Sequence, residues 1–169
     1  ALPISNWYEY QLEAELLHEY YRHGSRFPAY SSIVAGGKHA CILHYVENNA
    51  RLRAGDLVLV DAGCEWHGYA SDITRTYPIN GRFSGAQRDL YQVVFAAQEA
   101  ALASIVPNAP WDAPHQAAVR VLTQGLLDLG LLVGRLEDVL AQGDYRRFYM
   151  HRTGHWLGMD VHDVGRYKL

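Results

Sequence analysis

A predicted β-hairpin with an aspartate on each strand constrains this chain more than any other feature. Residues 57–60 are a short apolar run, and residues 69–79 are rich in β-branched and aromatic side chains. The intervening residues 66–67 are a plausible centre for a tight turn, so the two runs predict antiparallel strands. With that turn, Asp61 would lie directly opposite Asp72, and their Cβ atoms would be roughly 5 Å apart on one face.

Two facing carboxylates repel each other, so another group must neutralise the pair. A shared proton, a basic side chain such as Arg75, or a divalent cation would do so. Hard cations take carboxylate oxygens, and two ions roughly 3.5–4 Å apart are commonly bridged in this way. A register shifted by one residue would instead turn the two charges to opposite faces. The residues alone therefore leave metal binding open beside these alternatives, including an acidic pair that is merely hydrogen-bonded.

Three of the nine histidines cluster near the end of the chain, at positions 151, 155 and 162, close to Asp160 and Asp163. Histidine is the commonest metal ligand and carries protons near neutral pH. The spacing of His151 and His155 is that of a helical zinc pair, but an arginine follows His151 where a zinc protease needs glutamate. If the segment is extended, these two share one face, and His162 lies on the other unless a bend intervenes.

The remaining pattern predicts an α+β domain, because strands are followed by helices and then by further strands. Helices are expected at 9–22, from the capping box of Ser84 and Gln87 to Pro107, from 112 to Gly130, and at 136–141. Short strands are expected at 32–35 and 40–46, and strands with loops from Arg147 onward.

Length and composition exclude several classes of protein. The 169 residues suit one domain, and 15 basic against 18 acidic residues give no electrostatic basis for binding nucleic acid or an acidic membrane. No apolar run approaches the roughly 20 residues that cross a bilayer, and the first residues lack the blocks of a signal peptide. Cys41 and Cys64 are too few for a disulfide framework, so we expect a reduced, cytoplasmic setting.

Four motifs, in this order, resemble those of a known family. They are residues 42–45 (ILHY), 60–63 (VDAG), 71–76 (SDITRT) and 155–165 (HWLGMDVHDVG). They look like the motifs of the pita-bread metallopeptidases, most closely the bacterial Xaa-Pro aminopeptidases (aminopeptidase P), with prolidase as a near relative. The resemblance runs from the first helix to the last residue. It implies the pita-bread fold and a peptidase that acts before proline.

The resemblance also implies a dinuclear site and a role for each matching residue. The implied metal ligands are Asp61, Asp72 and His155, and the residues implied to hold substrate and stabilise the reacting carbonyl are His44, His151 and His162. In this family a metal-bridging hydroxide hydrolyses the bond between an N-terminal residue and a following proline. The implied cofactors are two divalent ions, usually Mn²⁺. The implied partner is a peptide with proline in second position, and the full-length protein is expected to be a homo-oligomer.

The chain departs from the family pattern in one respect. The family has two further glutamate ligands after the histidine motif and an additional N-terminal domain, and this sequence contains neither. We therefore expect residues 1–169 to be a partial catalytic domain with little or no activity alone. Two alternatives stay open: a prolidase that cleaves only dipeptides, and a metal-free pita-bread module that binds peptides or proteins.

Overall fold

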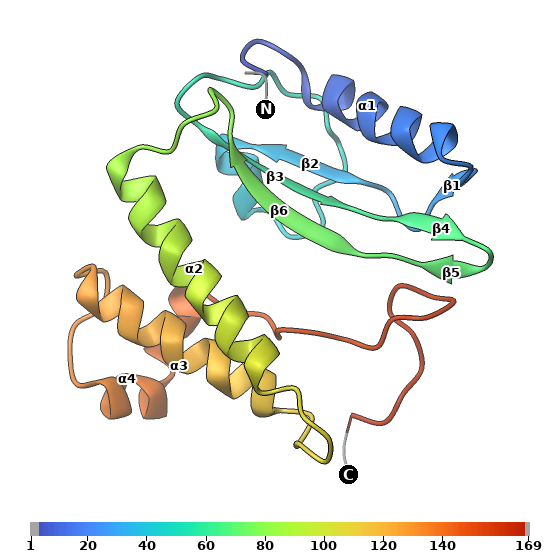
Figure 1. Ribbon diagram of the computed structural model, residues 1–169. Coiled ribbons are helices and arrows are strands. Elements are labelled where there is room, and N and C mark those ends of the chain that lie inside the picture. The colour runs from blue at the N-terminus through green and yellow to red at the C-terminus, as the bar shows by residue number, and fades with distance from the viewer. Residues whose placement is uncertain (1–3, 168–169) are drawn as a thin grey trace. The chain divides into compact units, whose positions relative to one another are not determined.

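The computed structural model describes residues 4–167, which form two compact units (Figure 1). The first unit contains residues 4–83 and 155–165, and the second contains residues 84–154 and 166–167. Within these residues, no helix combines the length and apolar character needed to span a membrane.

The first unit combines one helix with two small antiparallel sheets. Helix α1 is Glu9–Arg22, as predicted, and the strand orders are β2-β3-β6 and β1-β4-β5. The remaining elements are β1 (Phe27–Pro28), β2 (Ile33–Gly36), the 3₁₀ helix η1 (Gly37–Cys41), β3 (Leu57–Ala62), β4 (Cys64–Trp66), β5 (Tyr69–Ala70) and β6 (Ile73–Pro78). The mixture of helices and antiparallel strands confirms the expected α+β class.

The predicted strand over residues 40–46 is wrong. Those residues form the end of η1 and an irregular loop in which His44 has a φ of 54°. Tyr45 alone turns inward, at 6 % exposure, whereas Ile42 and Leu43 are exposed. The apolar run has the composition of a strand, but its residues do not alternate against a neighbouring strand.

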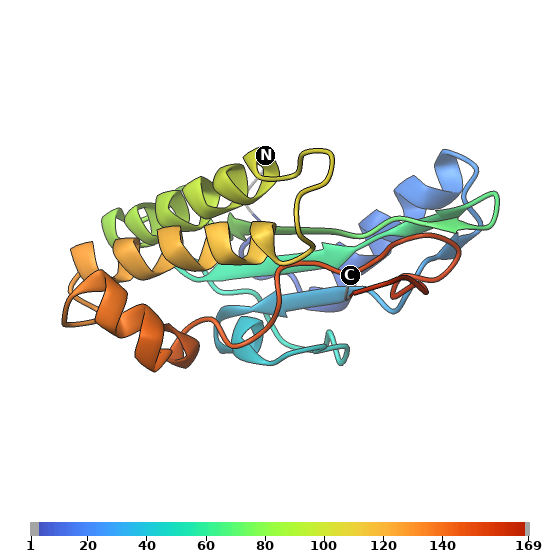
Figure 2. The ribbon, with the colours of Figure 1, turned by 90° about the horizontal axis from the view of Figure 1, so that it is seen from below.

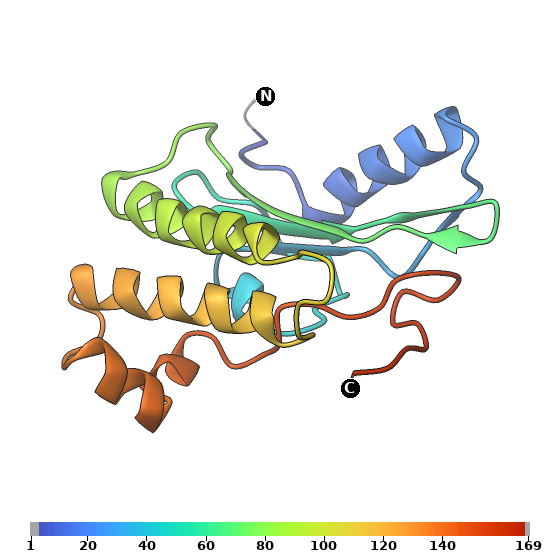
Figure 3. The same ribbon diagram turned by 60° about the horizontal axis from the view of Figure 1, so that its bottom comes forward.

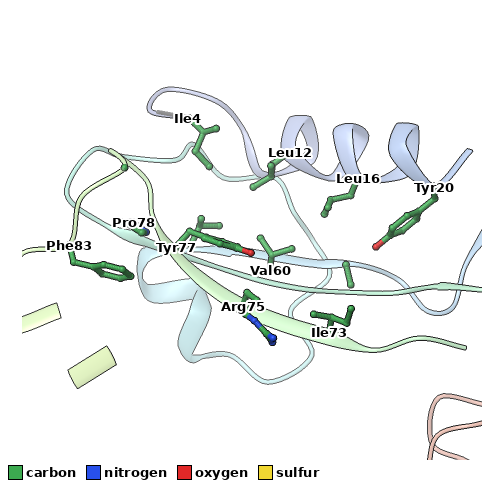
Figure 4. A pocket seen from close by; sticks show the side chains of 13 residues that line it. Ile4, Leu12, Leu16, Tyr20, Val60, Ile73, Arg75, Tyr77, Pro78 and Phe83 are labelled. Carbon is green, nitrogen blue, oxygen red and sulfur yellow. The ribbon is translucent and has the colours of Figure 1, made fainter. Parts of the chain in front are cut away.

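The two faces of the β2-β3-β6 sheet have different coverings, because successive side chains of a strand point to opposite sides. Val34 and Val58 belong to a core cluster under Leu12 and Leu16 of α1. A cavity of about 580 Å³ remains on this side (Figure 4). It is lined by Ile4, Leu12, Leu16, Tyr20, Val58, Val60, Ala62, Ile73, Arg75, Tyr77, Pro78, Gly81 and Phe83. Asp61 has the opposite parity on β3 and therefore lies on the other face.

The second unit is helical. It contains α2 (Gly85–Ala103), α3 (Ala113–Asp128), α4 (Leu136–Gln142) and the 3₁₀ helix η2 (Asp144–Arg147). Figures 2 and 3 show α2 and α3 side by side, and a Cβ on Gly125 of α3 would lie 2.3 Å from Val93 of α2.

The predicted helices of this unit are confirmed, although α2 ends at Ala103 rather than near Pro107. The capping box of Ser84 and Gln87 is present at its start. The strands predicted after Arg147 are wrong, because residues 148–167 contain only turns, bends and irregular backbone.

Candidate functional site

The hairpin register differs from the prediction by two residues. Asp61 pairs with Thr74, not with Asp72. The cause is the turn, which is centred on His67 and Gly68; both have positive φ values (52° and 84°), the conformation that favoured two-residue hairpin turns require. A shift of two residues preserves the face. Asp61 and Asp72 are therefore diagonal neighbours on the same side of the hairpin.

The hydroxyl of Tyr30 links the two carboxylates. It donates to Asp61 Oδ1 at 2.5 Å and lies 3.1 Å from Asp72 Oδ1. Burial is the largest cause that raises the pKa of Tyr30. The hydrogen bonds to Asp61 and Asp72 and their negative charges raise it further, so the pKa lies well above its usual range. The phenol therefore stays protonated as a donor between two like charges. Sequence reasoning missed Tyr30, because no spacing or pattern connects it with residues 31 and 42 positions away.

The backbone after β1 fixes the position of Tyr30. The amide of Ala29 donates to the carbonyl oxygen of Gly63 at 2.9 Å, which ties the strand leading to Tyr30 to the junction between β3 and β4. The pairing of β1 with β4 also holds the strand before Tyr30, and no local pattern in the sequence signals that long-range contact.

His155, near the far end of the chain, contacts Asp72. Its Nε2 lies 3.0 Å from Asp72 Oδ2, and its Nδ1 lies 2.9 Å from the carbonyl oxygen of Trp156. A carbonyl only accepts, so we assign the Nδ1 proton to that bond. The Asp72 carboxylate also only accepts, so the Nε2 contact needs a proton on that nitrogen or a cation in its place. A metal-ligating histidine usually has this arrangement, with its other N–H donated to a backbone carbonyl or a carboxylate.

A bend brings His162 beside His155, with ring centroids 4.1 Å apart. The bend closes where the amide of Asp163 donates to the Trp156 carbonyl at 3.0 Å. It is attached to the hairpin by the amide of Ala70, which donates to the Gly158 carbonyl at 2.8 Å. The segment therefore has the bend that would be needed to place both histidines on one side.

Of the other two predicted histidines, only His44 belongs to the same unit as this cluster, and it has no contact with the cluster within the described residues. His44 is an exposed residue of the loop after η1 in the first unit. His151 belongs to the second unit, where its Nδ1 lies 2.8 Å from the Arg152 carbonyl and its ring is edge-on to Tyr149 at 4.7 Å.

Arg75 does not neutralise the acidic pair. Its Nη1 donates to the Thr74 carbonyl at 2.8 Å, and its side chain lines the cavity on the α1 face (Figure 4). That alternative from the sequence is wrong, because Arg75 has the opposite parity from Thr74, the partner of Asp61.

The donor set fits the chemistry of divalent ions. Two carboxylates and an imidazole are ligands that ions such as Mn²⁺ accept. The contacts occur in pairs, Asp72 with His155 and each aspartate with Tyr30. Within residues 4–167 no group of three or more His, Cys, Asp or Glu side chains lies close enough to hold a metal ion.

Comparisons with known proteins identify the family to which the chain is similar. Residues 4–168 match Metallopeptidase family M24. The chain is 54 % identical over 162 residues to Xaa-Pro aminopeptidase of Haemophilus influenzae, covering 96 % of this chain and 38 % of that protein. It is 49 % identical over 160 residues to the Escherichia coli Xaa-Pro aminopeptidase, covering 95 % and 36 %.

Solved structures show the same similarity in three dimensions. Pseudomonas aeruginosa aminopeptidase PepP superposes with a TM-score of 0.96 at 55 % identity, over 98 % of this chain and 37 % of that one. A zinc-substituted Escherichia coli aminopeptidase P in complex with product gives 0.94 at 48 % identity, with the same coverage. The expected fold is confirmed. The chain spans less than two fifths of the length of these relatives.

Proposed function

Because this chain belongs to metallopeptidase family M24, we propose that the full-length protein hydrolyses the peptide bond between an N-terminal residue and a following proline. Two relatives at 54 % and 49 % identity are Xaa-Pro aminopeptidases, which supports this substrate class. The observation that carries the proposal is the chain of pairwise contacts in which Tyr30 links Asp61 to Asp72 and Asp72 contacts His155. Residues 1–169 would form part of the catalytic domain.

We propose that Asp61, Asp72 and His155 hold divalent ions, two in the full-length protein, with Mn²⁺ favoured by the oxygen-rich ligands. Such ions, when bound, polarise a carbonyl and lower the pKa of water. The chain's own residues prepare the site. Tyr30 fixes the spacing of the two carboxylates, and the Trp156 carbonyl holds the His155 ring by Nδ1.

The other histidines are proposed to act on the substrate. The ring of His162 lies beside that of His155, tilted by 43°, and we propose that it donates a hydrogen bond to the oxygen that becomes negative as the carbonyl is attacked. His44 and His151 would bind the peptide. These roles rest on the family motifs that the three positions match.

Exchange of one ligand tests the metal proposal. In the full-length protein, Asp72→Asn keeps the shape of the side chain and removes its charge and one oxygen acceptor. We expect kcat/KM for a Gly-Pro-containing peptide to fall by about 100-fold or more, since loss of a group that merely orients a ligand already costs 10- to 100-fold, and the heat of Mn²⁺ binding in calorimetric titration to be lost. Asp89→Asn changes an exposed aspartate of α2 and serves as the matched control. Undiminished Mn²⁺ binding by Asp72→Asn would contradict the proposed ligand.

Substrate length separates the two peptidase alternatives. An aminopeptidase cleaves longer Xaa-Pro peptides, and a prolidase is restricted to dipeptides. We propose the aminopeptidase. Rates measured on the full-length protein with an Xaa-Pro dipeptide and with an Xaa-Pro pentapeptide decide between the two.

We also propose that the full-length protein is a homo-oligomer with a cytoplasmic location. The free cysteines Cys41 and Cys64 are compatible with a reducing compartment.

A further inference from the structure

Side chains take the place of a neighbouring strand along the outer edge of β2. This strand lies at one end of the order β2-β3-β6, so alternate amides point away from β3. The amide of Val34 donates to Asn48 Oδ1 at 2.9 Å, and Asn48 Nδ2 donates back to the Ser32 carbonyl at 2.8 Å. The amide of Gly36 donates to Glu9 Oε1 at 2.8 Å. The edge is therefore closed by two residues from elsewhere in the chain.

Glu9 is fully buried and accepts from four donors. Oε1 takes the Gly36 amide and lies 3.2 Å from His39 Nδ1. Oε2 takes the Tyr45 hydroxyl at 2.8 Å and the Ala50 amide at 2.9 Å. Burial acts to raise the pKa of Glu9, but these hydrogen bonds outweigh it and the pKa is lowered. The group is thus a buried carboxylate with its acceptor capacity in use.

These contacts tie an otherwise irregular segment to α1. Residues 37–50 have no regular structure after η1, yet His39, Tyr45 and Ala50 all bind Glu9. The Asn48 side chain binds the edge of β2, as described above, and also Glu13 Oε2 at 2.9 Å. Charge-assisted hydrogen bonds in a buried site are among the strongest that a protein makes. The segment is held at several points over a short length.

Tyr45 of the tied segment lies on the sheet face that carries Asp61. Tyr45 packs with Ile33 and Ala35 of β2, and Ile33 is the β2 partner of Asp61. The residue before Tyr45 is His44. Its backbone is left-handed, a conformation that costs free energy for most residues other than glycine and that persists where the surrounding structure holds it. The contacts of Tyr45 therefore restrain the backbone next to His44.

We propose that Glu9 is a positioning residue for the reaction: its carboxylate holds residues 37–50 against the edge of β2 and so fixes His44 on the face of the sheet that carries Asp61. The inference rests on the proposed function, in which His44 binds the peptide. Glu9 itself touches neither substrate nor metal ligand and acts through Tyr45 and the backbone around it.

Glu9→Gln in the full-length protein tests the proposal, with Glu13→Gln as the matched control one helical turn away. The amide nitrogen of glutamine cannot accept, so the donors on one side of position 9 lose their acceptor. A glutamine at position 13 still accepts from Asn48 through its oxygen. We expect the amides of residues 42–50 to exchange with solvent about tenfold faster, or more, in Glu9→Gln only.

Kinetics provide a readout that a merely structural role would not change. We expect Glu9→Gln to raise KM for an Xaa-Pro peptide in the same direction as His44→Ala, with Mn²⁺ affinity unchanged. The double variant should then be little worse than His44→Ala, because both changes remove one interaction with substrate. Tyr45→Phe removes one of the four donors and keeps the ring, so it should show the same pattern more weakly if Glu9→Gln fails to fold.

Two results would overturn the proposal: exchange at residues 42–50 that matches Glu13→Gln, or effects of Glu9→Gln and His44→Ala on KM that simply add. The exchange measurement needs no substrate. It therefore decides whether Glu9 holds the segment even if the wild-type protein leaves Xaa-Pro peptides intact and the proposed function fails.

Discussion

A phenol between two carboxylates is the contact on which the candidate site depends most directly. Tyr30→Phe removes this shared donor and leaves Asp61 and Asp72 to repel each other with less constraint. Because groups that orient metal ligands typically contribute 10- to 100-fold in affinity, we expect Mn²⁺ binding by the full-length protein to weaken about tenfold. Calorimetric titration measures this.

Tyr10→Phe is the matched control for that change. Tyr10 is an exposed tyrosine of α1, and loss of its hydroxyl should leave Mn²⁺ binding as it is in the wild type. Tighter binding by Tyr30→Phe would show instead that the hydroxyl competes with the ion for the carboxylates.

The buried carboxylate of Glu9 predicts an acid-sensitive contribution to stability. Its pKa in the folded protein lies below the ordinary value of 4.5, so the unfolded chain binds more protons as the pH falls. The contribution is complete above the unfolded pKa and is lost as the pH drops through the folded one. The groups that face this carboxylate are His39 and Tyr45, besides the amides of Gly36 and Ala50.

Urea unfolding at a series of pH values checks this prediction. Between about pH 5 and pH 3, the free energy of unfolding should fall less steeply in Glu9→Gln than in the wild type. Glu13→Gln should follow the wild-type slope. Equal slopes for all three proteins would mean that Glu9 has the same proton affinity folded and unfolded.

At the scale of elements, one glycine allows the hairpin to change from the β3–β6 pair to the β4–β5 pair. A Cβ on Gly63 would lie 1.7 Å from the Ser71 carbonyl oxygen, which is backbone and cannot rotate away. Gly63→Ala should therefore lower the free energy of unfolding by about 3 kcal/mol. Gly85→Ala is the control, because nothing lies within 4 Å of its Cβ position, and it should be neutral or slightly stabilising. Urea denaturation of the two variants gives the comparison; a stable Gly63→Ala would contradict the close approach.

Elements with a local signal could be predicted from the sequence. The apolar stripe of α1 and the capping box of Ser84 depend on residues three or four apart, and both are confirmed. The hairpin was predicted with the correct face but the wrong partner for Asp61, because parity survives a shift of two residues whereas register depends on the φ values at His67 and Gly68.

Long-range contacts explain what the sequence could not predict. Residues 40–46 have strand composition, but the edge of β2 that they would pair with is occupied by side chains of Glu9 and Asn48. Tyr30 reaches the aspartates only because β1 pairs with β4. Neither contact leaves a periodic pattern in the sequence.

At the scale of the whole molecule, the chain carries the M24 fold over a limited length. The region aligned with the Haemophilus influenzae relative covers 96 % of this chain but only 38 % of that protein. Its described residues bring two carboxylates and one imidazole together in pairs. The family resemblance implies two further glutamate ligands in the full-length protein. A dinuclear site with three ligands would hold its ions less firmly than one with five.

We therefore predict that the 169-residue chain alone binds Mn²⁺ more weakly than the full-length protein and does not turn over a Gly-Pro peptide. The physical reason is charge: each of the two implied carboxylates would add a negative ligand that offsets the repulsion between two divalent ions. Titration with Mn²⁺ and peptide hydrolysis, measured on both proteins at the same ion concentration, make the comparison. The full-length Asp72→Asn variant sets the background rate, and hydrolysis by the short chain above that background would show that Asp61, Asp72 and His155 suffice for catalysis.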